Sequence, residues 1–188
     1  MKEWISQLDH RCFHALNRGI QNPFLDWLMP LLRESYVWVP LYAVILVWLI
    51  YRFRQRAWWP VVIVLFTFLL TDQISAHLIK SLVHRLRPCH TLSGSQIHLL
   101  VPCGAGFSFV SSHAANTFGF ATIMIILMGK PNRWLWLVAP LWATAVSLAQ
   151  IYVGLHYPVD VLGGAMLGIG TGLFSGYIYH RFAPQSFH

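Results

Sequence analysis

Long uncharged runs alternate with short polar segments along most of this sequence. A helix needs about 20 apolar residues to cross a bilayer core of about 30 Å. Five runs approach that length and predict five transmembrane helices: residues 35–51, 57–80, 114–129, 134–151 and 161–179. The second run contains Asp72 and His77 before its end at Lys80. Because an ionisable group inside a membrane is costly, we expect Asp72 to pair with His77 or with a polar residue on a facing helix.

Residues 4–20 and 24–32 follow a different pattern, in which apolar residues recur at roughly helical spacing among polar ones. This pattern is typical of amphipathic helices that lie in the membrane interface. We therefore predict an all-α integral membrane helical bundle. Residues 1–34 form the interfacial helices, residues 35–181 form the transmembrane core, and residues 1–188 make a single domain.

The composition supports a membrane protein with its chemistry on one side. Only 10% of the residues are charged, against about 25% in soluble domains, and the mean hydropathy is +0.55. The net charge of +7 does not indicate nucleic-acid binding, because basic residues gather in short loops at 52–56, 130–133 and 180–181. The positive-inside rule places those loops in the cytoplasm. The polar segments at 80–113 and 150–160 then face the opposite side.

Four glycines recur at four-residue steps in the last run: Gly164, Gly168, Gly172 and Gly176. Such a stripe lets another helix approach closely. Packing within one bundle is the simpler interpretation and a dimer face is the alternative, so the oligomeric state is left unassigned.

A histidine and a carboxylate stand four residues apart between the last two runs, at His156 and Asp160. Pro158 suits the first turn of a helix, and a carboxylate in that turn is favoured by the helix dipole. Asp160 could hold one imidazole nitrogen of His156 and leave the other free for nucleophilic attack. A purely structural pair at a helix start explains this stretch equally well.

Two further segments bring anion-binding groups to the same predicted side. Lys80 and Arg87 are two helical turns apart, and Pro88 biases Arg87 away from helix, so both cations can reach one anion. Ser111 or Ser112 can cap the third run, whose free N–H groups then form an anion site beside His113. Taken alone, the cations could be an interfacial basic cluster and the serines a plain helix cap.

Together these segments resemble the three motifs of the type 2 phosphatidic acid phosphatase superfamily. The matching stretches are Lys80-x6-Arg87-Pro88, Val110-Ser-Ser-His113 and Gln150-x5-His156-x3-Asp160. The superfamily includes membrane lipid phosphatases, glucose-6-phosphatase and vanadium haloperoxidases. Order and spacing match over roughly residues 72–164, and the hydrophobic layout of the rest resembles small bacterial members. The resemblance implies a membrane lipid phosphatase.

The motifs depart from the family pattern at two places. The second reads Val110-Ser111-Ser112-His113 where the family has Pro-Ser-Gly-His, and the third opens with Ala149-Gln150 where the family has Ser-Arg. Gln150 can donate hydrogen bonds to phosphate but brings no charge and no guanidinium. Reduced activity, a shifted substrate and a phosphate-binding protein without turnover all stay open, as does a phosphotransferase that uses another acceptor than water.

Residue chemistry and resemblance together imply one mechanism. His156, oriented by Asp160, attacks phosphorus to form a phosphohistidine, and His113 protonates the leaving group. The phosphoryl oxygens are expected to bind the following residues: Lys80, Arg87, Ser111, Ser112 and Gln150. Stabilisation of charge dominates phosphoryl-transfer catalysis. We expect no cofactor and no metal, because the chain lacks the carboxylate cluster of a magnesium site.

The substrate that this site implies is a lipid with a terminal phosphate or diphosphate, held in a bacterial inner membrane with the active site facing the periplasm. Candidates are phosphatidic acid, phosphatidylglycerol phosphate, undecaprenyl diphosphate and lipid A phosphate, and the motifs do not choose among them. In an oxidising periplasm, Cys89 and Cys103 could form a disulfide that braces the loop between the first two motifs.

Overall fold

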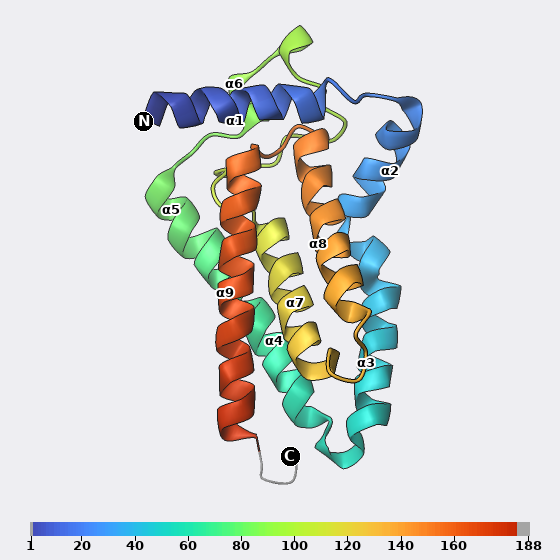
Figure 1. Cartoon of the computed structure of the whole chain (residues 1–188). Coiled ribbons are helices and arrows are strands. Elements are labelled where there is room, and N and C mark those ends of the chain that lie inside the picture. The colour runs from blue at the N-terminus through green and yellow to red at the C-terminus, as the bar shows by residue number, and fades with distance from the viewer. Residues whose placement is uncertain (1, 184–188) are drawn as a thin grey trace.

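The computed structural model describes residues 2–183, and these residues are helical with no strand among them (Figure 1). The helices of the bundle are α3 (Val39–Phe53), α4 (Trp58–Asp72), α7 (Ser112–Met128), α8 (Leu135–Tyr152) and α9 (Pro158–Phe182). The other helical elements include α1 (Lys2–Asn17), α2 (Pro23–Arg33), a π-helical segment (Gln73–Ile79), α5 (Lys80–Val83) and α6 (Pro88–Thr91). The predicted all-α bundle is confirmed.

Four segments of the described chain are long and apolar enough to cross a membrane: Ser35–Arg56, Trp58–Thr91, Leu135–Tyr152 and Pro158–Phe182. The third predicted span, residues 114–129, corresponds to α7, which is a shorter apolar helix of 17 residues. It lies in the middle of the bundle, with α4, α8 and α9 against it (Figure 1). A helix covered by its neighbours needs less length because few of its residues face lipid.

Helix α7 supplies the centre of the core. Its buried side chains enter three apolar clusters: Ala114 packs near Phe13 of α1, Met124 against Leu49 of α3, and Ile123 against Ile63 of α4. The first cluster lies beneath the N-terminus of α7 and the second near its other end. The core therefore fixes where α7 begins, and it thereby fixes the position of the residues at that end.

The glycine stripe of α9 lies against α7, so the interpretation as packing within one bundle is confirmed. A Cβ atom at Gly164 or Gly168 would collide with the backbone of α7 at Ser111 or Ala115. One at Gly172 would meet Thr122. The close approach holds the first turns of α7 and α9 side by side, and this matters for the site below.

The predicted N-terminal helices are present, and they are docked on the bundle. Helix α1 lies across the end of the bundle where α8 ends and α9 begins (Figure 1). Asn17 is fully buried and donates hydrogen bonds to the carbonyls of His98 and Tyr152, at 2.8 and 2.7 Å. Asp26 of α2 accepts hydrogen bonds from the Tyr152 hydroxyl and from the His98 ring, at 2.6 and 2.9 Å.

Asp72 follows one of the two predicted options. Its Oδ1 accepts a hydrogen bond of 3.5 Å from the side-chain amide of Asn116 on the facing helix α7. The π-helical segment begins directly after Asp72 and carries the chain to Lys80. Helix α5 then ends at Val83, and Arg87 is extended before Pro88, as the proline predicts.

Candidate active site

The candidate site lies where α7 and α9 begin. The N–H of Ser111 donates to the carbonyl of Asp160 at 2.9 Å and joins the two first turns. Ser111 is the N-cap of α7, and its Oγ accepts from the N–H of Ala114 at 3.4 Å. Pro158 opens α9, as predicted, and Asp160 lies in its first turn. Two helix N-termini, each favourable to anions, thus meet at one point.

His156 is buried, at 2% exposed, in the turn between α8 and α9. Its Nδ1 lies 3.7 Å from Oδ2 of Asp160 and 3.4 Å from Oγ of Ser108, and Ser108 in turn donates a hydrogen bond to the same Oδ2. Because 3.7 Å exceeds hydrogen-bond range, Ser108 connects the imidazole to the carboxylate. The sequence predicted the histidine and the aspartate as a pair but did not single out Ser108.

The surroundings of His156 favour its neutral form. Burial lowers the pKa of His156, since the charged imidazolium loses its hydration, and the cations Arg87 and Lys80 act in the same direction. The Asp160 carboxylate acts in the opposite direction. A neutral imidazole has the lone pair that a nucleophile needs.

A buried ion cluster holds Asp160 in place. Nη1 of Arg85 donates to Oδ1 of Asp160 at 2.7 Å, and Nη2 donates to Oδ2 of Asp9 on α1 at 2.5 Å. The other oxygen of Asp9 accepts from the N–H of Val159 at 2.9 Å, and the N–H of Tyr157 donates to Asp160 at 2.8 Å. The guanidinium also lies over the ring of Tyr157, 4.3 Å from its centroid.

Sequence reasoning missed Asp9 and Arg85. Arg85 lies inside the first motif, between Lys80 and Arg87, but its spacing did not indicate that it pairs with carboxylates. A signal existed in the composition, because the chain has only six acidic residues and a carboxylate on an amphipathic helix of such a chain is a candidate partner for a cation.

The two predicted cations, Lys80 and Arg87, lie near the same site but belong to different elements. Nε of Arg87 donates to the carbonyl of Gly106 at 3.4 Å, which holds the side chain against the loop before α7. Lys80, at the start of α5, and Arg87 both interact electrostatically with Asp160 and with His156. The described residues thus bring together the predicted nucleophile, its carboxylate and both cations.

His113 and Ser112, in the first turn of α7, line a cavity of about 730 Å³ whose other walls include residues of α3 and α4. Ser112 accepts a hydrogen bond of 3.0 Å from Ser75 of the π-helical segment. His113 interacts electrostatically with His156. The lining includes polar residues, among them Asp72, Asn116 and Arg33, and the following apolar ones: Val39, Val64, Leu65, Phe68, Phe120 and Val146.

Gln150 differs from the other predicted residues. It is 0% exposed near the end of α8, and neither its side-chain oxygen nor its nitrogen has a hydrogen-bond partner among the described residues. Its backbone carbonyl accepts from the N–H groups of Leu155 and His156, at 3.1 and 3.2 Å. The backbone of Gln150 therefore shapes the turn that carries His156.

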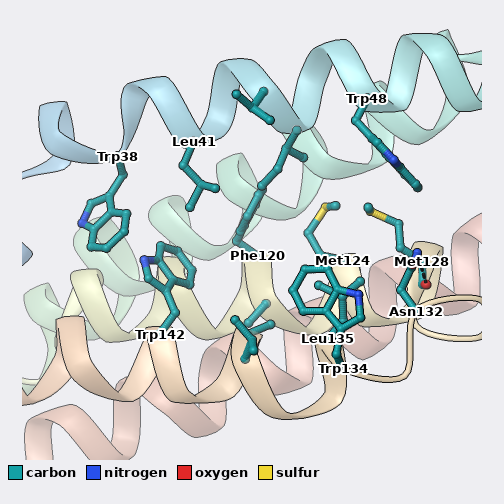
Figure 2. Close-up of a pocket in the computed structure, with 15 residues that line it drawn as sticks. Trp38, Leu41, Trp48, Phe120, Met124, Met128, Asn132, Trp134, Leu135 and Trp142 are labelled. Carbon is teal, nitrogen blue, oxygen red and sulfur yellow. Dashed lines mark hydrogen bonds between the residues drawn. The ribbon is translucent and has the colours of Figure 1, made fainter.

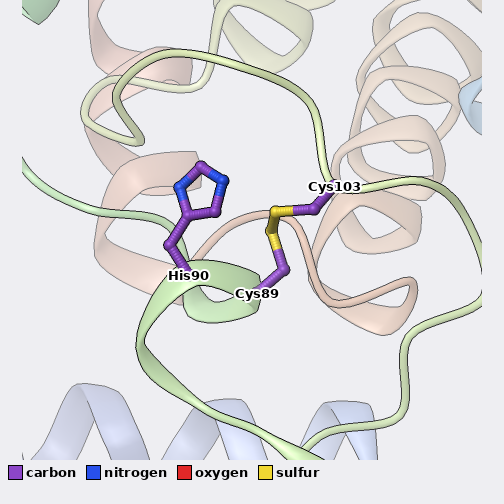
Figure 3. Close-up of side chains that lie close together, drawn as sticks. All are labelled: Cys89, His90 and Cys103. Atoms are coloured by element: carbon purple, nitrogen blue, oxygen red, sulfur yellow. A yellow bond between two sulfur atoms is a disulfide. The ribbon is translucent and has the colours of Figure 1, made fainter.

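The structure joins Cys89 and Cys103 in a disulfide (Figure 3). His90 lies beside it, and its ring nitrogen and the two sulfur atoms fall within 4.8 Å of one another. This grouping is not a metal site as it stands, because metals bind the thiolate and both thiols are consumed by the disulfide. The covalent link connects α6 to the loop before α7.

A second cavity of about 470 Å³ lies between α3 and the pair α7 and α8 (Figure 2). Its labelled walls are mainly tryptophan, leucine, phenylalanine and methionine side chains. Asn132 bonds to the carbonyl of Met128 at 3.2 Å. A groove with this lining suits hydrocarbon and offers no group for acid–base or nucleophilic chemistry. Of these two cavities, the one lined by His113 is therefore the candidate for substrate binding.

Comparison with known proteins identifies the family of this chain. The family model of the PAP2 superfamily matches residues 60–184. A lipid A 4'-phosphatase of Bacteroides thetaiotaomicron is 36% identical over 98% of this chain and 83% of its own length. An undecaprenyl-diphosphatase of Sulfolobus acidocaldarius is 29% identical over 77% of this chain and 66% of its own length.

A solved structure supports the fold. The transmembrane PAP2-type phosphatidylglycerolphosphate phosphatase of Bacillus subtilis superposes with a TM-score of 0.70 at 20% identity, over 96% of this chain and 89% of that one. The family model covers all three motifs, and the first relative covers nearly the whole chain. The chain therefore belongs to the PAP2 superfamily and is a membrane-embedded phosphatase of that superfamily.

Proposed function

We propose that this protein hydrolyses the phosphomonoester or diphosphate headgroup of a membrane lipid through a phosphohistidine at His156. The observation that carries the proposal is the chain His156–Ser108–Asp160, in which Nδ1 faces the carboxylate. Nε2 is then the ring nitrogen available to phosphorus. Asp160, held by Arg85, would stabilise the positive charge that develops on the ring as the bond forms.

The first step forms the bond between Nε2 and phosphorus and breaks the bond between phosphorus and the leaving oxygen. His113, in its protonated form, gives a proton to that oxygen. In the second step His113 takes a proton from water, the hydroxide oxygen bonds to phosphorus, and the phosphorus–nitrogen bond breaks. Inorganic phosphate leaves, and both histidines return to their starting states.

The phosphoryl oxygens need positive partners during both steps. Lys80 and Arg87 would supply the charge, and Ser111, Ser112 and the free N–H groups at the start of α7 would supply hydrogen bonds. Gln150 would add a neutral donor through its buried amide, which has no partner among the described residues. Asp160 and Asp9 each bond to Arg85, so neither is free to form a magnesium site, and we propose a metal-independent reaction.

Two observations support a lipid substrate. The cavity that begins at His113 and Ser112 continues between apolar side chains of α3 and α4, and these suit a hydrocarbon tail. The relatives named above act, by their names, on lipid A 4'-phosphate and on undecaprenyl diphosphate. A headgroup at the histidines with its tail in the cavity satisfies both.

We also propose that the site faces the periplasm from a bacterial inner membrane. The basic loops at 52–56, 130–133 and 180–181 lie at the end of the bundle opposite α1 and α6 (Figure 1). The positive-inside rule favours the cytoplasm for those loops. The disulfide lies at the site end, and disulfides persist in oxidising compartments such as the periplasm.

Phosphate release from a panel of lipid phosphates tests the proposal. Purified protein in detergent, with EDTA, is offered phosphatidic acid, phosphatidylglycerol phosphate, a polyprenyl diphosphate and lipid A. We expect release from at least one lipid, loss of release in His156→Ala and unchanged release in Arg133→Ala, whose exposed side chain lies at the other end of the bundle. Release that stops with EDTA, or that persists in His156→Ala, would contradict the proposed chemistry. No release from any lipid would contradict the substrate class.

A further inference from the structure

In the third motif of this chain, the neutral Gln150 stands where the family has arginine. The site therefore has one positive charge fewer than the family pattern. Gln150 is neutral and fully buried. Lys80 and Arg87 are the only predicted cations, whereas a lipid diphosphate carries more negative charge than two cations neutralise. The described structure supplies another guanidinium from a segment outside all three motifs.

Arg33 is the last residue of α2 and lines the same cavity as Ser112, His113, Asp72 and Asn116. Its side chain is only 18% exposed. Nη1 donates to Oε1 of Glu34 at 2.5 Å, while Nε is buried without a hydrogen-bond partner among the described residues. The end of α2 is fixed, because the Trp38 indole donates to the carbonyl of Leu32 at 2.8 Å.

A simple structural explanation covers part of this arrangement. A basic residue in the last turn of a helix interacts favourably with the helix dipole, and a neighbouring glutamate can pair with it. That role is met by an exposed side chain in water. It does not account for a guanidinium turned into a cavity with a buried donor left over, which costs free energy unless an anion meets it.

The charge of Arg33 also acts on other residues of the candidate site. It acts on His113 and on Arg87, which places the guanidinium within electrostatic range of both. Arg33 and His113 line the same cavity, and His113 protonates the leaving oxygen in the reaction proposed above, so we infer that Arg33 faces the leaving group.

We propose that Arg33 is a substrate-binding residue that contacts the anionic headgroup on the leaving-group side. The inference rests on the proposed function and narrows its substrate class. A lipid diphosphate leaves as a lipid monophosphate, whose new charge Arg33 can bind. A lipid phosphomonoester leaves as a neutral alcohol, which gains much less from Arg33. The site thus favours diphosphates.

The test compares a polyprenyl diphosphate with the monophosphate of the same chain, in wild type, Arg33→Ala, Arg33→Lys and the control Arg133→Ala. We expect wild type to prefer the diphosphate. In Arg33→Ala, kcat/KM for the diphosphate should fall roughly 10- to 100-fold, the range for one charged hydrogen-bonding contact, and that for the monophosphate only a few-fold. Arg33→Lys should be intermediate, and Arg133→Ala should match wild type.

Orthovanadate inhibition separates substrate binding from a structural role, because vanadate occupies the position of the transferred phosphoryl group. We expect its inhibition constant in Arg33→Ala to stay within about threefold of wild type, since the residues around that group are untouched. Equal losses on both lipids, a matching loss of vanadate affinity, or a wild type that hydrolyses only the monophosphate would each overturn the inference and leave the proposed function standing. A wild type silent on every lipid phosphate would overturn the proposed function itself.

Discussion

Removing Arg85 is the perturbation for which the structure gives the clearest expectation. Its guanidinium bonds to two carboxylates, Asp9 and Asp160, whose side chains are 2% and 0% exposed. Arg85→Met keeps much of the aliphatic stem and removes the charge. Two buried carboxylates are then left facing each other without a cation, and both must lose a hydrogen bond from a charged donor.

Removing one partner of a buried ion pair typically costs about 3–5 kcal/mol. Two charge-assisted hydrogen bonds at roughly 1.5–3 kcal/mol each give the same range. For a chain of this size, that corresponds to a drop in Tm of roughly 6–20 °C. Activity should fall as well, because Asp160 loses the group that orients it toward Ser108 and His156.

Thermal unfolding in detergent measures the first effect and kcat the second. Arg11→Met is the matched control, since Arg11 is exposed on α1 near Asp9. Asp9→Asn in the Arg85→Met background removes one of the two unpaired charges and should recover part of the lost stability. If Arg85→Met unfolds within 2 °C of Arg11→Met, a shift below the range derived above, the cluster does not hold α1 and α9 together as described.

Three further predictions address the nucleophile, the disulfide and Gln150. Because burial lowers the pKa of His156, its neutral form persists at lower pH, and the acid limb of kcat/KM against pH should fall below the ordinary histidine value of about 6.5; an acid limb above that value would contradict the assigned environment. Opening the disulfide by Cys89→Ser should lower the free energy of unfolding by about 3 kcal/mol in the chain-entropy account, and an unchanged Tm would show that the loop is fixed by other contacts. Gln150→Leu should leave Tm unchanged or higher, since its amide has no hydrogen-bond partner within residues 2–183, while kcat/KM falls roughly 2- to 10-fold through the loss of one neutral hydrogen bond; lower stability with full activity would refute a role in phosphate binding.

The sequence predicts the bundle well because membrane spans depend on length and hydropathy, which are local properties. It also predicts that Lys80, Arg87, His113, His156 and Asp160 meet, because their segments all end on the same side of the bundle. Even the break before Pro88 and the packing face of the α9 glycines follow from single residue types.

What it does not predict is how the N-terminal helices dock. The pattern of residues 4–20 specifies an apolar stripe but does not show that α1 crosses the end of the bundle. The pairing of Asp9 with Arg85 therefore cannot be predicted from the sequence. In the sequence Arg33 looks like an ordinary basic residue at a helix end, and only the structure shows that it lines the same cavity as His113. Ser108 is one of several serines in its loop, and only the fold shows which one contacts Asp160.

The central claim is that His156 carries the phosphoryl group, and trapping that group tests it most directly. Wild type and His156→Ala are mixed with a lipid phosphate labelled with ³²P, quenched in alkali within one turnover, digested and mapped by mass spectrometry. The account predicts a label that is stable in alkali, lost in acid, located on the peptide containing His156, and absent from His156→Ala. Phosphate release by wild type with the label on another residue, or with no labelled protein at any time in the turnover, would contradict it.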